Sequence, residues 1–504
     1  MRTSAISGAF LAACPLIFAN AAHASSILFT DATIISFDEA TNRTRILENS
    51  SLLLEDDRIS GIFETAPTSY PNGTEVVNAT GKILSPGFVN THHHLWQTAL
   101  KTIASNTTLV EYYQRYGEFS PTIQFMTPED KFLGTLTGAL ELLNSGTTTV
   151  LDHAHGDSSD ETADAIFNAT LSSGLRTFHA FTVHDIGNNY STTAQMAKLA
   201  SFASDTRLAS NSLVELGLGY DFFAAADEET LSELWDLVQS TNLSVVTTHY
   251  LGGPWSALNS PELLHSLGWL NTSLPVVFSH ASFITATDMT ALRSTSQYIS
   301  TTPESEMHYG HTHPYGDLIQ DQAALGVDTH FTFEASMVSQ ARMWLQSTRR
   351  KRFEQVLDTQ EVPASNPMSV EQAFYLMTRA GGLALRRPDL GVLVEGAKAD
   401  VLVMDGDSPN MLGWNDPIAA VILHSNPGDV EGVVVGGQWA KRDGKLTYDG
   451  YADVKRRFKE SAKRIQNDYA GQEWGPVDQG LFQQTSFIGH PRVVDTLPGD
   501  GTGY

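Results

Sequence analysis

The sequence contains almost no cysteine and few basic residues for the number of acidic ones. Its single cysteine, Cys14, lies within the first 24 residues, so the rest of the chain has no thiol and forms no disulfide. Lys and Arg together number 31 against 57 Asp and Glu, which gives a formal net charge of −26. Such acidity opposes binding to nucleic acid or to an anionic membrane. We therefore predict a small-molecule substrate, with neither nucleic acid nor membrane as a partner.

Beyond the N-terminus, no apolar run approaches the length of a membrane span. The first 24 residues are typical of a secretory signal peptide: Arg2 precedes an apolar stretch, and Ala22-His23-Ala24 is a small-x-small cleavage pattern. We predict cleavage after Ala24 and a secreted protein. Asn-x-Ser/Thr sequons further predict a glycoprotein; they begin at Asn42, Asn49, Asn72, Asn78, Asn106, Asn168, Asn189, Asn242 and Asn271.

The order of the apolar patterns predicts an α/β chain. Short β-type runs occur near both ends, at 27–35, 51–54, 59–63, 401–404, 419–423 and 433–439. Between them, strand-like runs alternate with helical patterns such as 129–143 and 228–239, as in a (β/α)₈ TIM barrel. The predicted domains are a signal peptide (1–24), a small β-sandwich from both chain ends (25–85 plus 390–450), the barrel (86–389), and a C-terminal helix and tail (451–504).

Several strand-like runs end in histidine or aspartate. His92 and His94 are two residues apart on an extended segment, so their imidazoles point the same way. His249, His280 and Asp328 each close an apolar run, and the carboxyl ends of barrel strands meet at one face. A single histidine at a strand end is more often structural, but five matching positions are an improbable coincidence. Three imidazoles and a carboxylate suit one divalent metal, with Zn²⁺ first and Fe²⁺ second, and a fourth imidazole could act on bound water.

Four motifs resemble the amidohydrolase superfamily, in the branch of cytosine and guanine deaminases, methylthioadenosine deaminases and triazine chlorohydrolases. Ser85–His94 is similar to its Pro-Gly-hydrophobic-Val-Asn-x-His-x-His strand, and Gly146–His153 to its second strand. Leu325–Asp328 resembles the end of its eighth strand, and Glu395–Val403 the strand that returns to the sandwich. On this resemblance the chain is identified as a secreted, fungal-type member of the superfamily.

The resemblance implies roles for particular residues. His92, His94, His249 and Asp328 match the ligands of a mononuclear metal site, and a metal-bound hydroxide would be the nucleophile. His280 matches the histidine that assists the water, and Asp328 would accept its proton. The family's dominant reaction is cleavage of a carbon–nitrogen bond other than a peptide bond, which predicts an amidohydrolase-type hydrolase. The resemblance also suggests a homo-oligomer.

One position departs from the family. Gly252 stands three residues after His249, where the deaminases and chlorohydrolases carry a proton-shuttling glutamate, and glycine cannot transfer a proton. Five residues near strand ends are candidates for substrate binding or for the missing acid-base role. Gln97 follows the His-x-His pair, His153 ends the predicted second strand, and Glu304, Glu306 and His311 follow the predicted seventh strand.

Gly252 leaves other functions open. One alternative is a lyase, dehydratase or decarboxylase acting on a secondary metabolite through the same metal site. Another is a non-catalytic secreted protein that binds metal or a small molecule. A carbohydrate hydrolase would need paired carboxylates at strand ends, and histidine dominates the predicted face instead.

Overall fold

The structure is a computed structural model that describes residues 26–121, 125–256, 258–477, 480–482, 486–492 and 494. The predicted signal peptide lies outside these residues. Among the helices of the described part, none has both the length and the apolar character of a membrane span.

Eight parallel strands form a nearly closed barrel, which confirms the predicted α/β class. In spatial and chain order they are β6 (Phe88–His93), β7 (Thr147–Ala154), β8 (Arg176–Thr182), β9 (Val214–Gly219), β10 (Val245–Tyr250), β11 (Val276–His280), β12 (Tyr298–Thr301) and β13 (Ala323–Leu325). The last strand returns to the first through a parallel bridge between His93 and Asp328. The Asp328 N–H donates to the His92 carbonyl at 2.9 Å, so the metal-ligand candidates of both strands meet at this seam.

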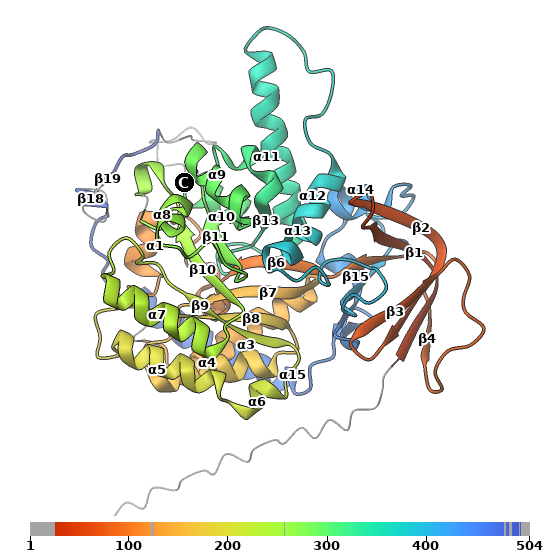
Figure 1. The fold of residues 1–504 in the computed structure, drawn as a ribbon, viewed down its shortest axis with the longest axis horizontal. Coiled ribbons are helices and arrows are strands. Elements are labelled where there is room, and N and C mark those ends of the chain that lie inside the picture. The colour runs from red at the N-terminus through yellow and green to blue at the C-terminus, as the bar shows by residue number, and fades with distance from the viewer. Residues whose placement is uncertain are drawn as a thin grey trace, which may run out of the picture.

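Helices surround the barrel (Figure 1). They are α3 (Pro128–Asn144), α4 (Asp160–Ser172), α5 (Thr192–Ala203), α6 (Thr206–Ala209), α7 (Glu228–Thr241), α8 (Pro261–Ser266), α9 (Ala286–Thr295), α10 (Pro303–His308), α11 (Met337–Leu357), α12 (Val370–Met377) and α13 (Arg379–Ala384). Short 3₁₀ turns lie in the loops: η2 (Gly253–Trp255), η3 (Gly316–Leu318) and η4 (Gln320–Gln322). Strong N-caps start the longer helices; Thr127, for example, accepts from the Asp130 N–H and begins α3.

Both ends of the chain contribute to a second sheet, seen at the right of Figure 1. Its strands are β1 (Ser26–Asp38), β2 (Arg43–Glu55), β3 (Arg58–Phe63), β4 (Glu75–Asn78), β5 (Lys82–Pro86), β14 (Val401–Asp405), β15 (Val430–Val435), β16 (Gln438–Arg442) and β17 (Lys445–Leu446). Strand β14 pairs with β5, which runs directly into the barrel at β6. The sheet therefore anchors the strand that carries His92 and His94.

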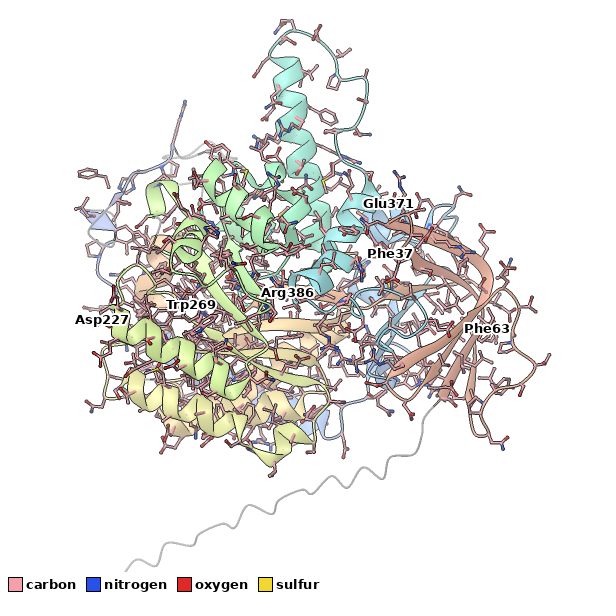
Figure 2. The ribbon with its side chains drawn as sticks, viewed as in Figure 1. Phe37, Phe63, Asp227, Trp269, Glu371 and Arg386 are labelled. Carbon is pink, nitrogen blue, oxygen red and sulfur yellow. The ribbon has the colours of Figure 1, made fainter. Side chains whose placement is uncertain are left out.

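Polar and apolar contacts join this sheet to the barrel. Arg176, only 2% exposed, makes a two-pronged ion pair with Asp400 at 2.9 and 3.0 Å. On the other side, Phe37 and Glu371 lie where β1 faces α12 (Figure 2), and Glu371 accepts from the Thr44 N–H at 3.3 Å. The contacts tie residues more than 200 positions apart into one body.

The predicted strand at 419–423 is wrong. Residues 417–424 form a helical turn, made of α14 (Pro417–Ala419) and η5 (Ala420–His424), followed by η6 (Pro427–Asp429). Asp416 caps this turn, because its carboxylate accepts from the Ile418 and Ala419 N–H groups. A buried apolar run of five residues has no periodicity that separates strand from helix, and the cap decided the outcome.

The remaining elements belong to neither of the two sheets described above. They are η1 (Leu95–Leu100), α1 (Leu109–Arg115), α15 (Tyr451–Ala470), β18 (Leu481–Phe482) and β19 (Ser486–Phe487). Helix α15 packs on α3 and η1, and its Ile465 is fully buried among Trp96, Leu100 and Tyr112. The C-terminal helix therefore supports the segment that covers the site.

Candidate metal centre and cavity

The strand pleat separates His92 and His94 from the histidine between them. His93 points away from the barrel axis and lies in a buried network, with its Nε2 2.9 Å from His330 Nδ1 and its Nδ1 3.1 Å from Asn90 Nδ2. His92 and His94 point inward, and their rings lie 4.8 Å apart. The alternation predicted for an extended segment thus directs His92 and His94 into the barrel and His93 away from its axis.

Three imidazoles and a carboxylate converge at the carboxyl end of the barrel. Asp328 Oδ1 lies 3.3 Å from His92 Nε2 and 3.1 Å from His94 Nε2, and His249 Nε2 lies 3.3 Å from His94 Nε2. Tetrahedral ligands with bonds of about 2.0–2.1 Å are separated by roughly 3.3 Å. His92 Nε2 is also buried without a hydrogen-bond partner. These donors therefore fit one divalent metal ion, with zinc well suited to the set.

The other ring nitrogen of each histidine is held by a polar group. Ser279 Oγ lies 2.7 Å from His92 Nδ1, the His94 Nδ1 donates to the His153 carbonyl at 2.8 Å, and Asp221 Oδ2 lies 2.9 Å from His249 Nδ1. Such contacts fix the orientation of each ring and leave the lone pair of Nε2 directed inward, where it could bind a metal.

The charges of the cluster favour metal ligation. Burial lowers the pKa of His92 well below its usual value, so this imidazole is neutral, as a ligand must be. Burial works against ionisation of Asp328, but its contacts with the His92 and His94 imidazoles outweigh burial and hold its pKa well below the usual range. Burial likewise opposes the charged form of His249, but nearby Asp221 raises its pKa to about 9, so this imidazole holds a proton at neutral pH and would release it on binding a metal.

His280 lies beside the ligands, with its ring 5.1 Å from that of His92. Its Nδ1 is 2.8 Å from Thr302 Oγ1 and 3.7 Å from Glu306 Oε1. Both His280 and Asp328 have a φ of 71°, a left-handed conformation that is uncommon for residues other than glycine. Such backbone conformations persist where the surroundings enforce them and are frequent at functional sites.

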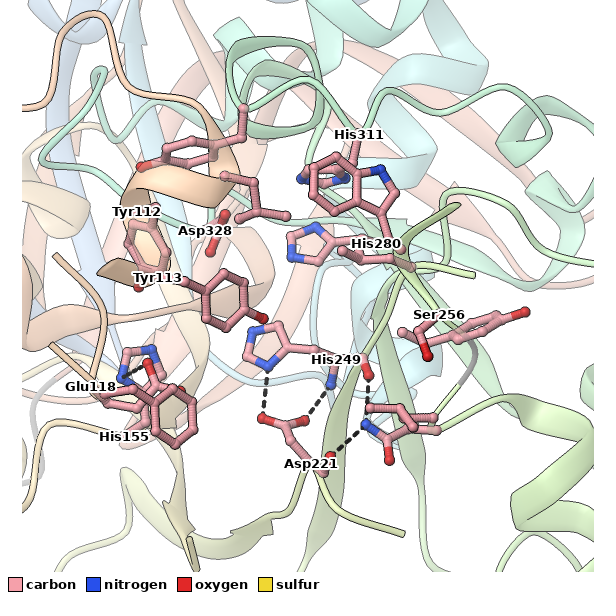
Figure 3. A pocket seen from close by; sticks show the side chains of 18 of the residues that line it. Tyr112, Tyr113, Glu118, His155, Asp221, His249, Ser256, His280, His311 and Asp328 are labelled. Carbon is pink, nitrogen blue, oxygen red and sulfur yellow. Dashed lines mark hydrogen bonds and ion pairs between the residues drawn. The ribbon is translucent and has the colours of Figure 1, made fainter. Parts of the chain in front are cut away.

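A cavity of about 350 Å³ opens above the cluster (Figure 3). His94, His249, His280 and Asp328 contribute to its floor, and its walls include acidic, aromatic and aliphatic side chains. The wall residues include Leu109, Tyr112, Tyr113, Glu118, Phe119, His155, Asp185, Asp221, Phe222, Leu251, Trp255, Tyr309 and His311. Among the described lining residues there is no Lys or Arg.

The structure brings some of the predicted substrate residues to the cavity and not others. His311 lines it, with its ring 4.9 Å from that of His280. Gln97 and His153 are buried outside the described lining; Gln97 donates to Tyr112 Oη and to the Tyr116 carbonyl, both at 3.0 Å.

Glu304 and Glu306 also lie outside the described lining of the cavity. Glu304 turns toward α11, where its carboxylate accepts from Gln340 Nε2 at 3.1 Å. Glu306 is fully buried; it accepts from the Thr302 N–H at 2.8 Å and lies 2.9 Å from His313 Nδ1. Helix α10 begins at Pro303, so both carboxylates leave from its first turn and not from an open loop over the cavity.

Sequence reasoning missed three carboxylates of the described cavity lining, Asp185, Asp221 and Glu118. Asp221 lies two residues after the end of β9, so the strand-end rule that selected the histidines could have found it. Glu118 follows α1 in a loop that no strand pattern marks, and only the tertiary structure brings it to the cavity.

Comparison with known proteins identifies the family. The amidohydrolase family model matches residues 83–440, and the chain belongs to this family. It is therefore an amidohydrolase-type enzyme. It is similar to the 5'-deoxyadenosine deaminase of Methanothermobacter thermautotrophicus, with 23% identity over 408 residues, 79% of this chain and 91% of that protein. It is also similar to the 5-methylthioadenosine/S-adenosylhomocysteine deaminase of Thermococcus kodakarensis, with 25% identity over 403 residues, 77% of this chain and 89% of the relative.

Solved structures share the fold. An adenosine deaminase from Xanthomonas campestris with bound zinc superposes with a TM-score of 0.73 at 16% identity, over 88% of this chain and 99% of that one. An atrazine chlorohydrolase from Arthrobacter aurescens in complex with zinc gives 0.71 at 18% identity, over 86% and 100%.

Proposed function

We propose that the protein is a zinc-dependent hydrolase that cleaves a non-peptide carbon–nitrogen bond of a small ring compound. The observation that carries this proposal is the convergence of His92, His94, His249 and Asp328 on one point at the floor of the cavity. The deaminases named above, and the zinc bound in two structural neighbours, support it.

In the proposed mechanism a zinc ion held by His92, His94, His249 and Asp328 would supply Lewis acidity and would lower the pKa of the attacking water. Asp328 takes a proton from this water. His280 lies beside the metal-ligand candidates, and its Nδ1 is 2.8 Å from Thr302 Oγ1. The Nε2 of His280 can therefore polarise the water or the developing oxyanion.

The cavity lining favours a flat, uncharged or cationic substrate. Tyr112, Tyr113, Phe119, Phe222 and Trp255 supply aromatic surface. Because no Lys or Arg is found among the described lining residues, a phosphate or carboxylate group would enter without a cation to pair with. This feature disfavours nucleotides as substrates, and it also disfavours a decarboxylase, whose substrate must carry a carboxylate.

A panel assay tests the proposal. Zinc-loaded protein is incubated with adenosine, 5'-methylthioadenosine, guanine, melamine and atrazine, and released ammonia, amine or chloride is measured. We expect turnover of at least one neutral amino-substituted ring, and loss of that turnover in Asp328→Asn. Zinc-loaded wild type that releases nothing from any of these compounds would contradict the proposal. Adenosine 5'-monophosphate serves as the anionic control and should not be turned over.

The protein is proposed to be secreted and N-glycosylated, and the sheet from both chain ends to act as a small β-sandwich domain. Every sequon asparagine except Asn168 is exposed, as glycan attachment requires. Expression in a secreting eukaryotic host should place the protein in the medium, with Ser25 at its N-terminus by sequencing. Treatment with an N-glycosidase should lower its mass; retention of the protein in the cell with residues 1–24 attached would contradict secretion.

A further inference from the structure

Cleavage of a carbon–nitrogen bond needs an acid as well as a nucleophile, because an amine leaves poorly without a proton. Residues near the end of β10 do not supply this acid. Gly252 has a φ of 72°, and a Cβ there would lie 3.0 Å from the Phe283 carbonyl oxygen, so the turn excludes a longer side chain. The acid must come from elsewhere in the cavity wall.

Four carboxylates belong to the described lining of the cavity, and three of them already have other contacts. Asp328 contacts His92 and His94. Asp221 is occupied by His249, whose ring Nδ1 and backbone N–H lie 2.9 and 2.6 Å from its two oxygens. Asp185 is exposed, and its carboxylate accepts from the Gly187 N–H in its own turn. The fourth carboxyl group belongs to Glu118.

The environment of Glu118 suits a carboxylic acid that keeps its proton. The residue is 9% exposed, and one carboxyl oxygen lies 3.6 Å from His155 Nδ1. That nitrogen accepts a hydrogen bond from Trp96 Nε1 at 3.2 Å, and because an indole N–H can only donate, Nδ1 carries no proton. Glu118 therefore lies beside an imidazole nitrogen that carries no proton and not beside a cationic N–H. Burial raises the pKa of Glu118, in agreement with this geometry.

Charged and titratable groups reach Glu118 from several elements. Asp221, after β9, disfavours its ionised form, while His249 on β10 and His94 after β6 favour it. The phenols of Tyr112 and Tyr113, on α1, are uncharged because burial raises the pKa of each. His155 is neutral because burial lowers its pKa well below the usual value.

The loop that carries Glu118 is held in place. Gln97 donates to the Tyr116 carbonyl, the Gly117 N–H donates to the Tyr112 carbonyl at 2.9 Å, and Ser120 Oγ donates to the Gly117 carbonyl at 2.6 Å. Tyr469 from α15 stacks on Tyr116 with 5.6 Å between ring centroids. The His155 ring lies 4.0 Å from that of His94, so Glu118 is one imidazole away from a metal-ligand candidate. Figure 3 shows Glu118 with Tyr113 across the cavity from His280.

We propose that Glu118 is a catalytic residue that protonates the leaving nitrogen, an inference that rests on the proposed function. Water adds its oxygen to the ring carbon and gives one proton to Asp328. The carbon–nitrogen bond then breaks, the bonding pair stays on nitrogen, and the Glu118 proton completes the free amine or ammonia. The proton on Asp328 is returned through solvent to Glu118, so the enzyme ends unchanged and one water is consumed.

The test compares Glu118→Gln with Glu141→Gln. Glu141, on α3, is a second glutamate whose pKa is raised by burial, but it lies outside the cavity and pairs with Lys101. The probes are adenosine, whose leaving group needs a proton, and 6-chloropurine riboside, which releases chloride without one. If the panel selects another amino ring, that compound and its chloro analogue replace them.

We expect Glu118→Gln to lower kcat for the amino compound by on the order of 10²-fold or more. Turnover of the chloro compound should change by less than about threefold, the scale of a minor perturbation and well below a general-acid effect. Metal content and Tm should match wild type, and Glu141→Gln should turn over both probes as wild type does. Equal losses with both probes, or no loss with either, would overturn the proposal.

A second measurement needs no substrate and separates this proposal from the proposed function. Infrared spectra of wild type and of the two variants are recorded at neutral pH and compared in the region of the carbonyl stretch of a protonated carboxylic acid. This band should be equally strong in wild type and in Glu141→Gln, and weaker in Glu118→Gln. An unchanged band would show that Glu118 is ionised and cannot donate, even if the panel finds a substrate. If the band is weakened in Glu118→Gln but the panel finds no turnover, the proposed function fails and the protonated state of Glu118 stands.

Discussion

At the scale of single residues, the groups around the ligands decide how firmly a metal is held. Asp221 is the clearest case, because it fixes both the ring and the backbone of His249. Its two contacts hold the ring in the orientation that directs Nε2 toward the other ligands.

Replacement of Asp221 by Asn should weaken zinc binding by about 10–100-fold without unfolding the protein. The amide keeps the shape of the side chain but loses the charge that strengthens the imidazole. Competition with a chromogenic chelator measures the affinity. Asp236→Asn, at an exposed position on α7, is the matched control and should bind zinc as wild type does. Equal affinity of both variants would refute the role given to Asp221.

Glu306 should make stability depend on pH. Burial favours its neutral form, but His280 and His313 outweigh burial and lower its pKa to about 2, from 4.5 in the unfolded chain. A lowered pKa in the folded state stabilises the protein above pH 4.5, and this contribution is lost as pH falls toward 2. At neutral pH, Glu306→Gln should therefore lower the free energy of unfolding by on the order of 3 kcal/mol.

Urea unfolding of Glu306→Gln and wild type between pH 7 and pH 2 checks this expectation. The gap between the two proteins should close as the pH falls. The exposed pair of Glu354 and Arg350 provides the control, since Glu354→Gln should differ little from wild type at any pH. A gap for Glu306→Gln that is constant across the range would contradict the assignment.

At the scale of elements, helix α15 stabilises the segment that covers the cavity. Ile465 is fully buried in the cluster that includes Trp96, Tyr112 and Tyr309. Its truncation leaves a void beneath η1 and α1, and side chains of α1 form part of the cavity wall.

We expect Ile465→Ala to reduce the free energy of unfolding by about 2–5 kcal/mol and to raise KM more than it lowers kcat. Chemical denaturation and steady-state kinetics measure the two effects. Val362→Ala removes two carbons from a residue that is 84% exposed and should change neither quantity. Unaltered kinetics in a destabilised Ile465→Ala would mean that α15 does not support the cavity.

The sequence predicts elements well where a pattern has a fixed period. The His-x-His strand, the barrel order and helices such as 228–239 follow from alternation and from helical spacing, and α7 covers Glu228–Thr241. The run at 419–423 is too short to have a period, and a cap from Asp416 makes it helical. Glu118 could not be predicted, because its place depends on loop packing between η1, α1 and α15.

At the scale of the whole molecule, the buried pair of Arg176 and Asp400 joins the barrel to the sheet from both chain ends. Asp400 also accepts from the Gly436 N–H at 2.7 Å, and its carbonyl accepts from the Gly87 N–H at 3.0 Å. The pair therefore lies where β8, β15 and the start of β6 meet.

Asp400→Asn should lower the free energy of unfolding by about 3–5 kcal/mol, because it leaves the Arg176 charge buried without its partner. Calorimetry of the variant should show a large fall in Tm. Asp407→Asn, at an exposed position, should leave Tm unchanged. A fall of similar size in both variants would show that the effect does not come from the buried pair.

The proposed function depends on a single metal site at the barrel floor. Elemental analysis of the purified protein, prepared without chelator, tests it most directly when wild type and His92→Ala are measured side by side. We predict about one zinc or iron per chain in wild type and almost none in His92→Ala. A folded wild-type protein without metal, or a variant that keeps a full equivalent, would contradict the central claim.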